Sequence, residues 1–234
     1  MVPLPLNDNV RRSTFCYSTL AIIAANAYVF WLELSLGGHL DRLIYFYGIV
    51  PARYTTLRGL ETLTPAGFVI PIFASMFLHA GWLHLLGNML FLYVFGRTVE
   101  DHFGHLKFLL LYFASGFAGA LLHIYLNAGS GVPSIGASGA IAGVLGAYFV
   151  TAPRARIKLT IFPLIFWTFH LPAVLVLGYW FLIQFLEGYQ MLAIETATRG
   201  GGTAWWAHVG GFISGMLVAM ILEPRRPPPV QFSV

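Results

Sequence analysis

The feature that most constrains this chain is a series of long apolar runs separated by short polar stretches. The hydrocarbon core of a bilayer is about 30 Å thick, and a helix needs about 20 apolar residues to cross it. The runs predict an all-α fold, a polytopic membrane protein with a bundle of six transmembrane helices. The fourth run is short, so it must begin near residue 133 or lie among neighbouring helices. The predicted spans are residues 15–36, 82–99, 108–126, 138–150, 172–188 and 205–222.

Composition supports lipid as the solvent. Only 9% of the 234 residues are charged, whereas an average soluble domain has roughly a quarter. A net charge of +4 is also found in proteins that bind nucleic acid. The basic residues are spread between the apolar runs, however, so we expect no nucleic acid. The single cysteine, Cys16, excludes an intrachain disulfide framework, and we expect it to face lipid or the core.

Lysine and arginine placement predicts the orientation. In a six-span arrangement nine of these residues fall on one side and four on the other, and the positive side of a membrane protein faces the cytoplasm. We therefore expect both termini in the cytoplasm, with residues 1–14 as a tail, 15–222 as the membrane domain and 223–234 as a disordered tail. The first run could instead be a cleaved signal peptide, but it continues to Leu32, which favours an uncleaved span.

The connections differ in character. Residues 37–81 form a long outer loop with apolar stretches, which we expect to lie in the membrane interface. Residues 189–204 contain three consecutive glycines and predict a flexible outer loop. Pro153, Pro163 and Pro172 predict an irregular link into the fifth span.

Polar residues occur inside three of the spans. They are His84 and Asn88 one helical turn apart, Ser138, and His208. Such residues are costly in a membrane and usually face a cavity or a partner. With a rise of about 1.5 Å per residue, His84, Ser138 and His208 each lie about 18–22 Å from the inner end of their span. We therefore expect them to meet at one depth, in the outer part of the membrane.

These residue types together suit acyl-transfer chemistry. A serine hydroxyl needs an adjacent base to act as a nucleophile, which makes Ser138 the predicted nucleophile and His208 its base. His84, Asn88 and the Ser138 backbone N–H at a helix start are predicted to stabilise an oxyanion. No carboxylate is placed to complete a triad, because Glu100 lies about 18 Å deeper along its helix and Glu187 and Glu195 lie at the outer ends or loops near the fifth span. We therefore expect a Ser–His dyad.

Glycines have two predicted roles around the serine. Gly136 and Gly139 flank Ser138 closely enough to let a substrate backbone approach it. Small residues also let membrane helices pack closely. The pairs Gly139/Gly143 and Gly211/Gly215 therefore predict packing between the fourth and sixth spans, which would bring Ser138 and His208 together.

Four short motifs follow one another along the chain: His84-x-x-x-Asn88 preceded by His79, Gly96-x-x-x-Glu100-x-x-x-Gly104, Gly136-Ala137-Ser138-Gly139, and Ala207-His208-x-x-Gly211. Through these motifs the chain resembles the rhomboid family of intramembrane serine proteases over roughly residues 60–222. The resemblance implies a six-helix core, a Ser–His dyad, no cofactor, and single-span transmembrane proteins as substrates. It also implies that the fifth span and last outer loop act as gate and cap, and we expect a bacterial cell membrane.

Two departures from the family pattern stand out. The tryptophan–arginine pair common in the first outer loop is not recognisable near residues 61–65. Some relatives place an aromatic residue one turn after the serine, where it stacks on the histidine. Here that position is Ala142, so another side chain must orient His208.

Other roles remain open for some residues and for the whole chain. We expect His79 to be a structural hydrogen-bonding residue and Glu100 to brace the inner end of the second span. A zinc site usually needs three or four ligands, and only His79 and His84 are close in sequence, so no metal is expected. The alternative functions are a non-proteolytic relative that binds membrane clients and a small channel or transporter. The apolar inner halves of the spans argue against a channel.

Overall fold

The computed structural model describes residues 3–161, 164–194 and 204–222. Most of these residues are helical, and a helical segment lies at each of the six predicted spans. Gly200–202 and the predicted tail 223–234 lie outside the described residues. The segments are α1 (Tyr17–Ser35), α6 with α7 (Trp82–Phe91 and Arg97–Phe103), α8 (His105–Leu126), α9 (Ser138–Thr151), α10 (Ala173–Ile194) and α11 (Trp205–Ile221).

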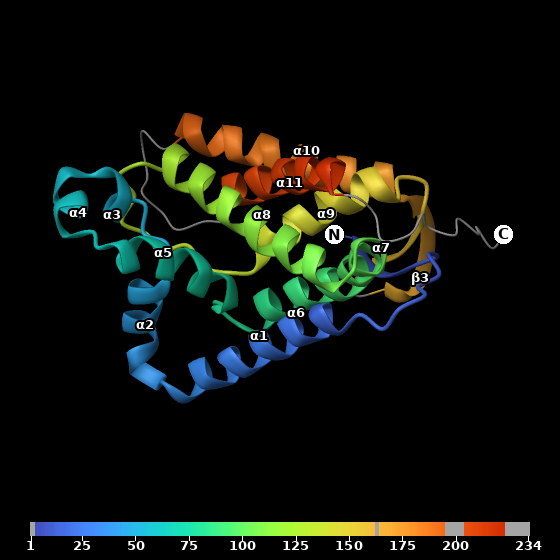
Figure 1. Cartoon of the computed structure of the whole chain (residues 1–234), viewed down its shortest axis with the longest axis horizontal. Helices are drawn as coiled ribbons and strands as arrows, with labels where there is room; N and C mark the ends of the chain where they lie inside the picture. Colours follow the sequence, from blue (N-terminus) through green and yellow to red (C-terminus); the bar gives the residue numbers. More distant parts are fainter. Residues whose placement is uncertain (1–2, 162–163, 195–203, 223–234) are drawn as a thin grey trace.

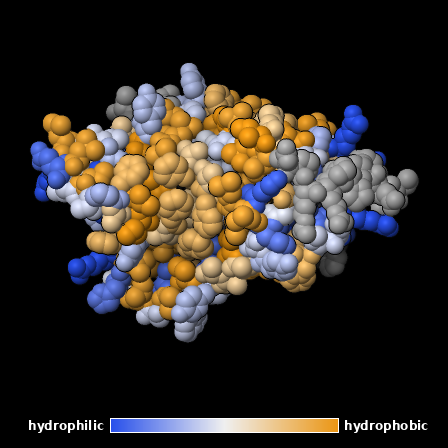
Figure 2. All heavy atoms as spheres, in the orientation of Figure 1, coloured by the Kyte–Doolittle hydropathy of each residue, from blue (hydrophilic) through white to orange (hydrophobic). Residues whose placement is uncertain are grey.

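Fewer helices in the described part of the structure are long and apolar enough to span a membrane than the six that the apolar runs predict. Two described helices, α1 and α8, are long and apolar enough to cross a membrane. A third span is obtained if Pro65–Phe77 and Trp82–Phe103, bent by 87°, are counted as one broken segment. Figure 2 shows a broad apolar surface over the middle of one face, with hydrophilic residues mainly toward its ends. The chain is a helical membrane protein, whereas the count of six spans and the side of the termini stay predictions.

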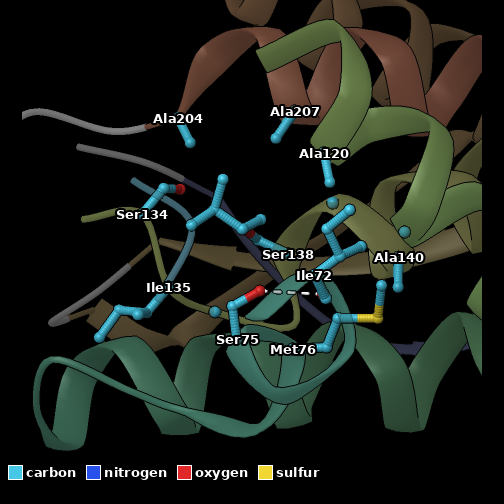
Figure 3. A pocket seen from close by; sticks show the side chains of 14 residues that line it. Ile72, Ser75, Met76, Ala120, Ser134, Ile135, Ser138, Ala140, Ala204 and Ala207 are labelled. Carbon is cyan, nitrogen blue, oxygen red and sulfur yellow. Dashed lines mark hydrogen bonds between the residues drawn. The ribbon is translucent and has the colours of Figure 1, made fainter. Parts of the chain in front are cut away.

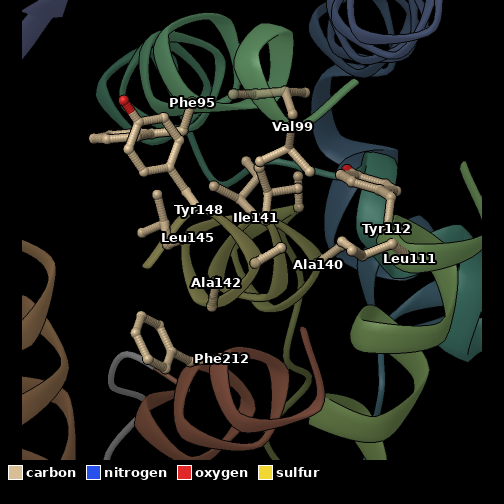
Figure 4. Packing of buried hydrophobic residues seen from close by; sticks show 14 of the residues in the cluster. Phe95, Val99, Leu111, Tyr112, Ala140, Ile141, Ala142, Leu145, Tyr148 and Phe212 are labelled. Carbon is tan, nitrogen blue, oxygen red and sulfur yellow. The ribbon is translucent and has the colours of Figure 1, made fainter. Parts of the chain in front are cut away.

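Helix α9 forms the centre of the bundle. It contacts α8, α10, α11 and the π-helical turn η3 (Leu92–Gly96) that joins α6 to α7, and its residues Ala140 to Tyr148 are all buried. A helix that is apolar on every side belongs in a core. Figure 4 shows Phe212 of α11 on one side of α9 and Phe95 on another, where it meets Tyr148 edge-on at 5.0 Å.

Glycine contacts join α9 to α11 almost backbone to backbone. A Cβ at Gly211 would lie 2.0 Å from the carbonyl oxygen of Gly139, and one at Gly215 would lie 1.9 Å from that of Gly143. Any side chain at these positions would force the helices apart. The predicted glycine packing between the fourth and sixth spans is therefore confirmed.

A small antiparallel sheet is formed by part of the predicted N-terminal tail and by the link into the fifth predicted span. Its strands are β1 (Pro3–Asp8), β2 (Arg156–Ile161) and β3 (Leu164–Pro172), in the order β1-β2-β3. The prediction of an irregular link was therefore wrong, and the all-α prediction holds in the coarser form that the described residues are mostly helical. The sheet lies at the end of the molecule opposite α3 and α4 (Figure 1).

Buried and accessible residues alternate along β2, which explains why this segment is a strand. Ile157 and Leu159 are buried, while Arg156 and Lys158, each one residue before them, are more accessible. This is the pattern of a strand with one covered face. The prolines that suggested an irregular link lie outside β2 or at the end of β3. Lys158 pairs with Asn7 on one side and with His170 on the other.

Buried carboxylates anchor the N-terminal segment. Asp8 forms an ion pair with Arg12 and accepts hydrogen bonds from Thr98 at 2.7 Å and Tyr148 at 2.9 Å. Glu100 similarly accepts hydrogen bonds from the start of α1 and from His105. The expected bracing role of Glu100 is confirmed, and it acts by capping the free N–H groups at the beginning of α1.

Short helices occupy residues 37–81, the predicted outer loop. They are η1 (Gly37–His39), α2 (Leu40–Tyr47), α3 (Ala52–Thr55), α4 (Leu57–Thr62), α5 (Pro65–Ala74) and η2 (Ser75–Phe77). Large apolar side chains are exposed here, for example Phe46 at 65% and Leu57 at 82%. These exposed groups fit the predicted position in the membrane interface, which stays a prediction.

Candidate active site

The predicted nucleophile and base are in direct contact. Ser138 is the first residue of α9, and His208 lies in the first turn of α11. The Ser138 Oγ–H donates to His208 Nε2 over 2.7 Å. The glycine contacts between α9 and α11 hold the two helix starts at this separation. The structure thus brings together the two residues on which the sequence-based mechanism depends.

The second ring nitrogen of His208 has a partner that sequence reasoning missed. His208 Nδ1 lies 2.6 Å from Gln184 Oε1 on α10. An amide oxygen can only accept, so Nδ1 carries the proton and Nε2 is left to accept from Ser138. A signal for Gln184 was present, because it is a polar side chain inside a predicted span.

Aromatic rings from α10 and α11 lie beside the His208 ring. The ring of Trp180, one turn before Gln184, has its centre 5.8 Å from that of His208. Trp205 approaches the same ring edge-on at 6.2 Å. Ala142, where some relatives have a stacking aromatic residue, is fully buried. In this chain the contacts that orient His208 come from α10 and α11 rather than from α9.

His84 and Asn88 lie beside the backbone that leads into Ser138. A Cβ at Gly136 would be 2.7 Å from His84 Nε2 and 3.7 Å from Asn88 Nδ2. Gly136 also has φ of +125°, a backbone conformation that favours glycine. The Ala80 N–H donates to His84 Nδ1 at 3.4 Å, so the His84 proton lies on Nε2, facing Gly136. Both side chains can therefore donate near the serine.

His79 is a buried hydrogen-bond partner of Asn88. Asn88 Nδ2 donates to His79 Nε2 at 3.0 Å, and the His79 ring is 1% exposed. The His79 backbone N–H is held by the carboxylate of Glu33 on α1, at 3.2 and 3.3 Å. This is the structural hydrogen bonding expected for His79. Glu33 was not recognised from the sequence, although an acidic residue within an apolar run is itself a signal.

The histidines near the site do not form a metal cluster. Across the ranges that the structure describes, no group of three or more His, Cys, Asp or Glu side chains is arranged to hold a metal ion. The His79 and His84 rings meet edge-on, with centres 5.0 Å apart. Each of the two rings already has a hydrogen-bond partner in the site.

A cavity of about 20 Å³ opens beside Ser138. Figure 3 shows Ser138 with Met76, Ala140 and Ala207 among the side chains around it. Ser75 also lines it, and its hydroxyl donates to the carbonyl of Ile72 at 3.0 Å. The cavity is about large enough for one water molecule, and most of its walls are small or apolar side chains.

Comparisons with known proteins place these residues within one type of domain. A family model described as the Rhomboid domain matches residues 66–225, which contain every predicted site residue. The mitochondrial Rhomboid protein 1 of Saccharomyces cerevisiae is 35% identical over 165 residues, covering 67% of this chain and 44% of that protein. RHOMBOID-like protein 1 of Arabidopsis thaliana is 34% identical over 157 residues, covering 66% and 34%. The mitochondrial presenilin-associated rhomboid-like protein of Bos taurus is 29% identical over 221 residues, covering 90% and 48%. The chain thus spans less than half the length of each of these relatives.

Proposed function

The chain belongs to the rhomboid family, and from this premise we propose that it is an intramembrane serine endopeptidase. It cleaves peptide bonds in or near the transmembrane segments of single-span membrane proteins. Ser138 and His208 act as a catalytic dyad, and the reaction passes through an acyl-enzyme. The observation that carries the proposal is the hydrogen bond of 2.7 Å from the serine hydroxyl to the histidine.

The dyad works by proton transfer. His208 Nε2 takes the hydroxyl proton as Ser138 Oγ attacks the scissile carbonyl carbon. The protonated histidine then gives this proton to the leaving amine, and the C–N bond breaks. In the second half, His208 removes a proton from water, and the water oxygen attacks the acyl carbon. The bond from this carbon to Ser138 Oγ then breaks, the new carboxyl group is released, and His208 returns the proton to Oγ. The cavity beside Ser138 has room for such a water.

The oxyanion is stabilised by donors from two helices. His84 Nε2–H and Asn88 Nδ2–H lie beside Gly136, two residues before Ser138, and the backbone N–H of Ser138 is the third donor. The start of α9 also carries free N–H groups and the positive end of its dipole, which favour a developing negative charge. Donors of this kind contribute about 10²–10³ in rate each.

The proposal includes six spans with both termini in the cytoplasm. Six helical segments at the predicted positions and the nine-to-four distribution of basic residues support it. Because α9 leads into β2, Ser138 lies at the end of α9 away from the sheet, which then faces the cytoplasm. The site is therefore in the outer part of the membrane. The relatives include mitochondrial proteins, so they do not support the predicted bacterial cell membrane.

The alternative is a rhomboid-like protein that binds membrane clients without cutting them. Such a protein needs the fold but has no need of a serine hydroxyl directed at an unprotonated histidine nitrogen. The Ser138–His208 contact therefore favours the protease.

A reconstituted assay tests the proposal. The purified chain in liposomes is incubated with a fluorescently labelled single-span protein, beside the variants Ser138→Ala and His208→Ala. We expect cleavage by the parent and loss of it in both variants. Ser35→Ala is the matched control, because Ser35 is exposed and bonded only to its own helix at Leu32. Cleavage by Ser138→Ala at the parental rate would rule out the mechanism.

A further inference from the structure

Gln184 is a buried amide on an otherwise apolar helix face. Only 6% of its surface is exposed. Neighbouring side chains of α10 pack on α11, with ring centres 4.7 Å apart for Phe181 and Phe212 and 6.0 Å apart for Phe185 and Trp206. The amide is thus enclosed between α10 and α11, where a buried polar group needs a hydrogen-bond partner.

The partner of this amide is the proposed catalytic base. Gln184 Oε1 accepts the Nδ1–H of His208 at 2.6 Å, and His208 itself is only 7% exposed. A ring whose Nδ1–H is held in this way has an unprotonated Nε2 and a restricted rotation. Both properties are needed for Nε2 to accept the proton of Ser138.

We propose that Gln184 is a positioning residue that holds His208 in the tautomer and orientation in which it can act as a base. The inference rests on the proposed function and deepens it. Ser138 and His208 belong to α9 and α11, but Gln184 belongs to α10. The base is therefore correctly set only while α10 is packed against α11, so a displacement of α10 removes the acceptor and lowers the reactivity of Ser138.

A purely structural role for Gln184 makes different predictions. If the side chain only filled space between the two helices, an unbranched apolar residue of similar size would replace it without loss. If it positions His208, a replacement must keep an oxygen acceptor at the same place. Methionine and glutamate separate the two cases, because both match the length of glutamine and only glutamate keeps the acceptor.

The experiment compares Gln184→Met and Gln184→Glu with the parent. Two rates are measured well below the unfolding midpoints of all variants: cleavage of the single-span substrate and labelling of Ser138 by a fluorophosphonate. We expect Gln184→Met to lower kcat and the labelling rate by about 10- to 100-fold, with KM changed less than twofold. We expect Gln184→Glu to recover most of this loss. Gln190→Met is the matched control, since Gln190 lies on the same helix and is exposed.

The outcomes separate this inference from the proposed function. Parental kcat in Gln184→Met would overturn the inference and leave the dyad in place. A loss of activity equal in both Gln184 variants and matched by a lower unfolding midpoint would also overturn it, because that result describes packing alone. If the parent and Ser138→Ala cleave alike, the proposed function fails first and the inference fails with it.

Discussion

Replacement of Gly211 by alanine gives a direct test of how packing sets the active-site geometry. Gly211 is one turn beyond His208 on α11, and its Cα faces the backbone of Gly139 on α9, the residue after Ser138. A Cβ at position 211 would lie 2.0 Å from the Gly139 carbonyl oxygen. Real Cβ atoms essentially never come closer than 3.0 Å to such an atom, and a backbone carbonyl inside a helix cannot rotate away.

The two helices must therefore separate by about 1 Å at this point, because the protein interior is close-packed and has no free space to absorb the methyl group. Ser138 and His208 lie at the starts of α9 and α11, close to this glycine contact, so most of the displacement reaches them. Their contact of 2.7 Å then lengthens past the range of a hydrogen bond. A misplacement of about 1 Å can cost about 10²-fold in rate, and overpacking of this kind costs about 1–3 kcal/mol of stability.

The assay measures kcat for cleavage, fluorophosphonate labelling of Ser138 and the unfolding midpoint of Gly211→Ala. We expect kcat and labelling to fall about 100-fold in protein that is still folded at the assay temperature. Gly178→Ala is the control, since a Cβ there meets only the Phe149 ring at an ordinary 3.8 Å. Full activity in Gly211→Ala would refute the argument that glycine packing sets the dyad distance.

Three further predictions address other parts of the molecule. His84→Ala and Asn88→Ala should each lower kcat by about 10²–10³-fold with little change in KM, measured by steady-state cleavage; a change confined to KM would contradict an oxyanion role. Cys16 should resist alkylation by iodoacetamide at pH 8, followed by mass spectrometry, because its side chain is buried and its thiol donates to the Arg97 carbonyl at 3.1 Å; rapid labelling of the folded chain would contradict this. Thr98→Val should lower the free energy of unfolding by about 1–3 kcal/mol, because it removes a hydrogen bond to the buried Asp8 carboxylate; an unchanged unfolding midpoint would show that β1 is held by other contacts.

The helices could be predicted from the sequence because each apolar run by itself indicates a helix that spans the membrane. The last span was predicted at residues 205–222 and is found at Trp205–Ile221. The second was predicted to end at residue 99, but helix continues to Phe103 through Arg97 and Glu100. Those charged residues suggest an end of the apolar run, yet Glu100 is fully buried by its bonds to the start of α1.

The sheet could not be predicted from local sequence patterns in this way. The alternation in β2 is local, but β1 pairs with it across about 150 residues of chain, and no local pattern in Pro3–Asp8 identifies that partner. Two prolines in β1 also argue against a strand when the sequence is read locally. They are tolerated because β1 is an edge strand, where a missing backbone N–H costs little.

The site residues that could be predicted are those whose place follows from their depth along a single helix. Ser138, His208 and His84 were placed at one depth by counting residues from the inner ends of their spans, and Asn88 by lying one helical turn from His84. Gln184 depends on which face of α10 meets α11, and that choice is made by the crossing of two helices rather than by spacing within one. The partner of His208 therefore needed the three-dimensional structure.

The identity of that partner follows from the surroundings. In serine proteases that work in water, a carboxylate holds the second nitrogen of the histidine. A carboxylate between α10 and α11 would be charged among aromatic rings, where burying a charge without a full set of partners is costly. A glutamine offers the same kind of acceptor oxygen at the same reach without the charge. An uncharged acceptor orients the proposed base less strongly than a carboxylate would, so the proposed dyad depends on α10 keeping its place against α11.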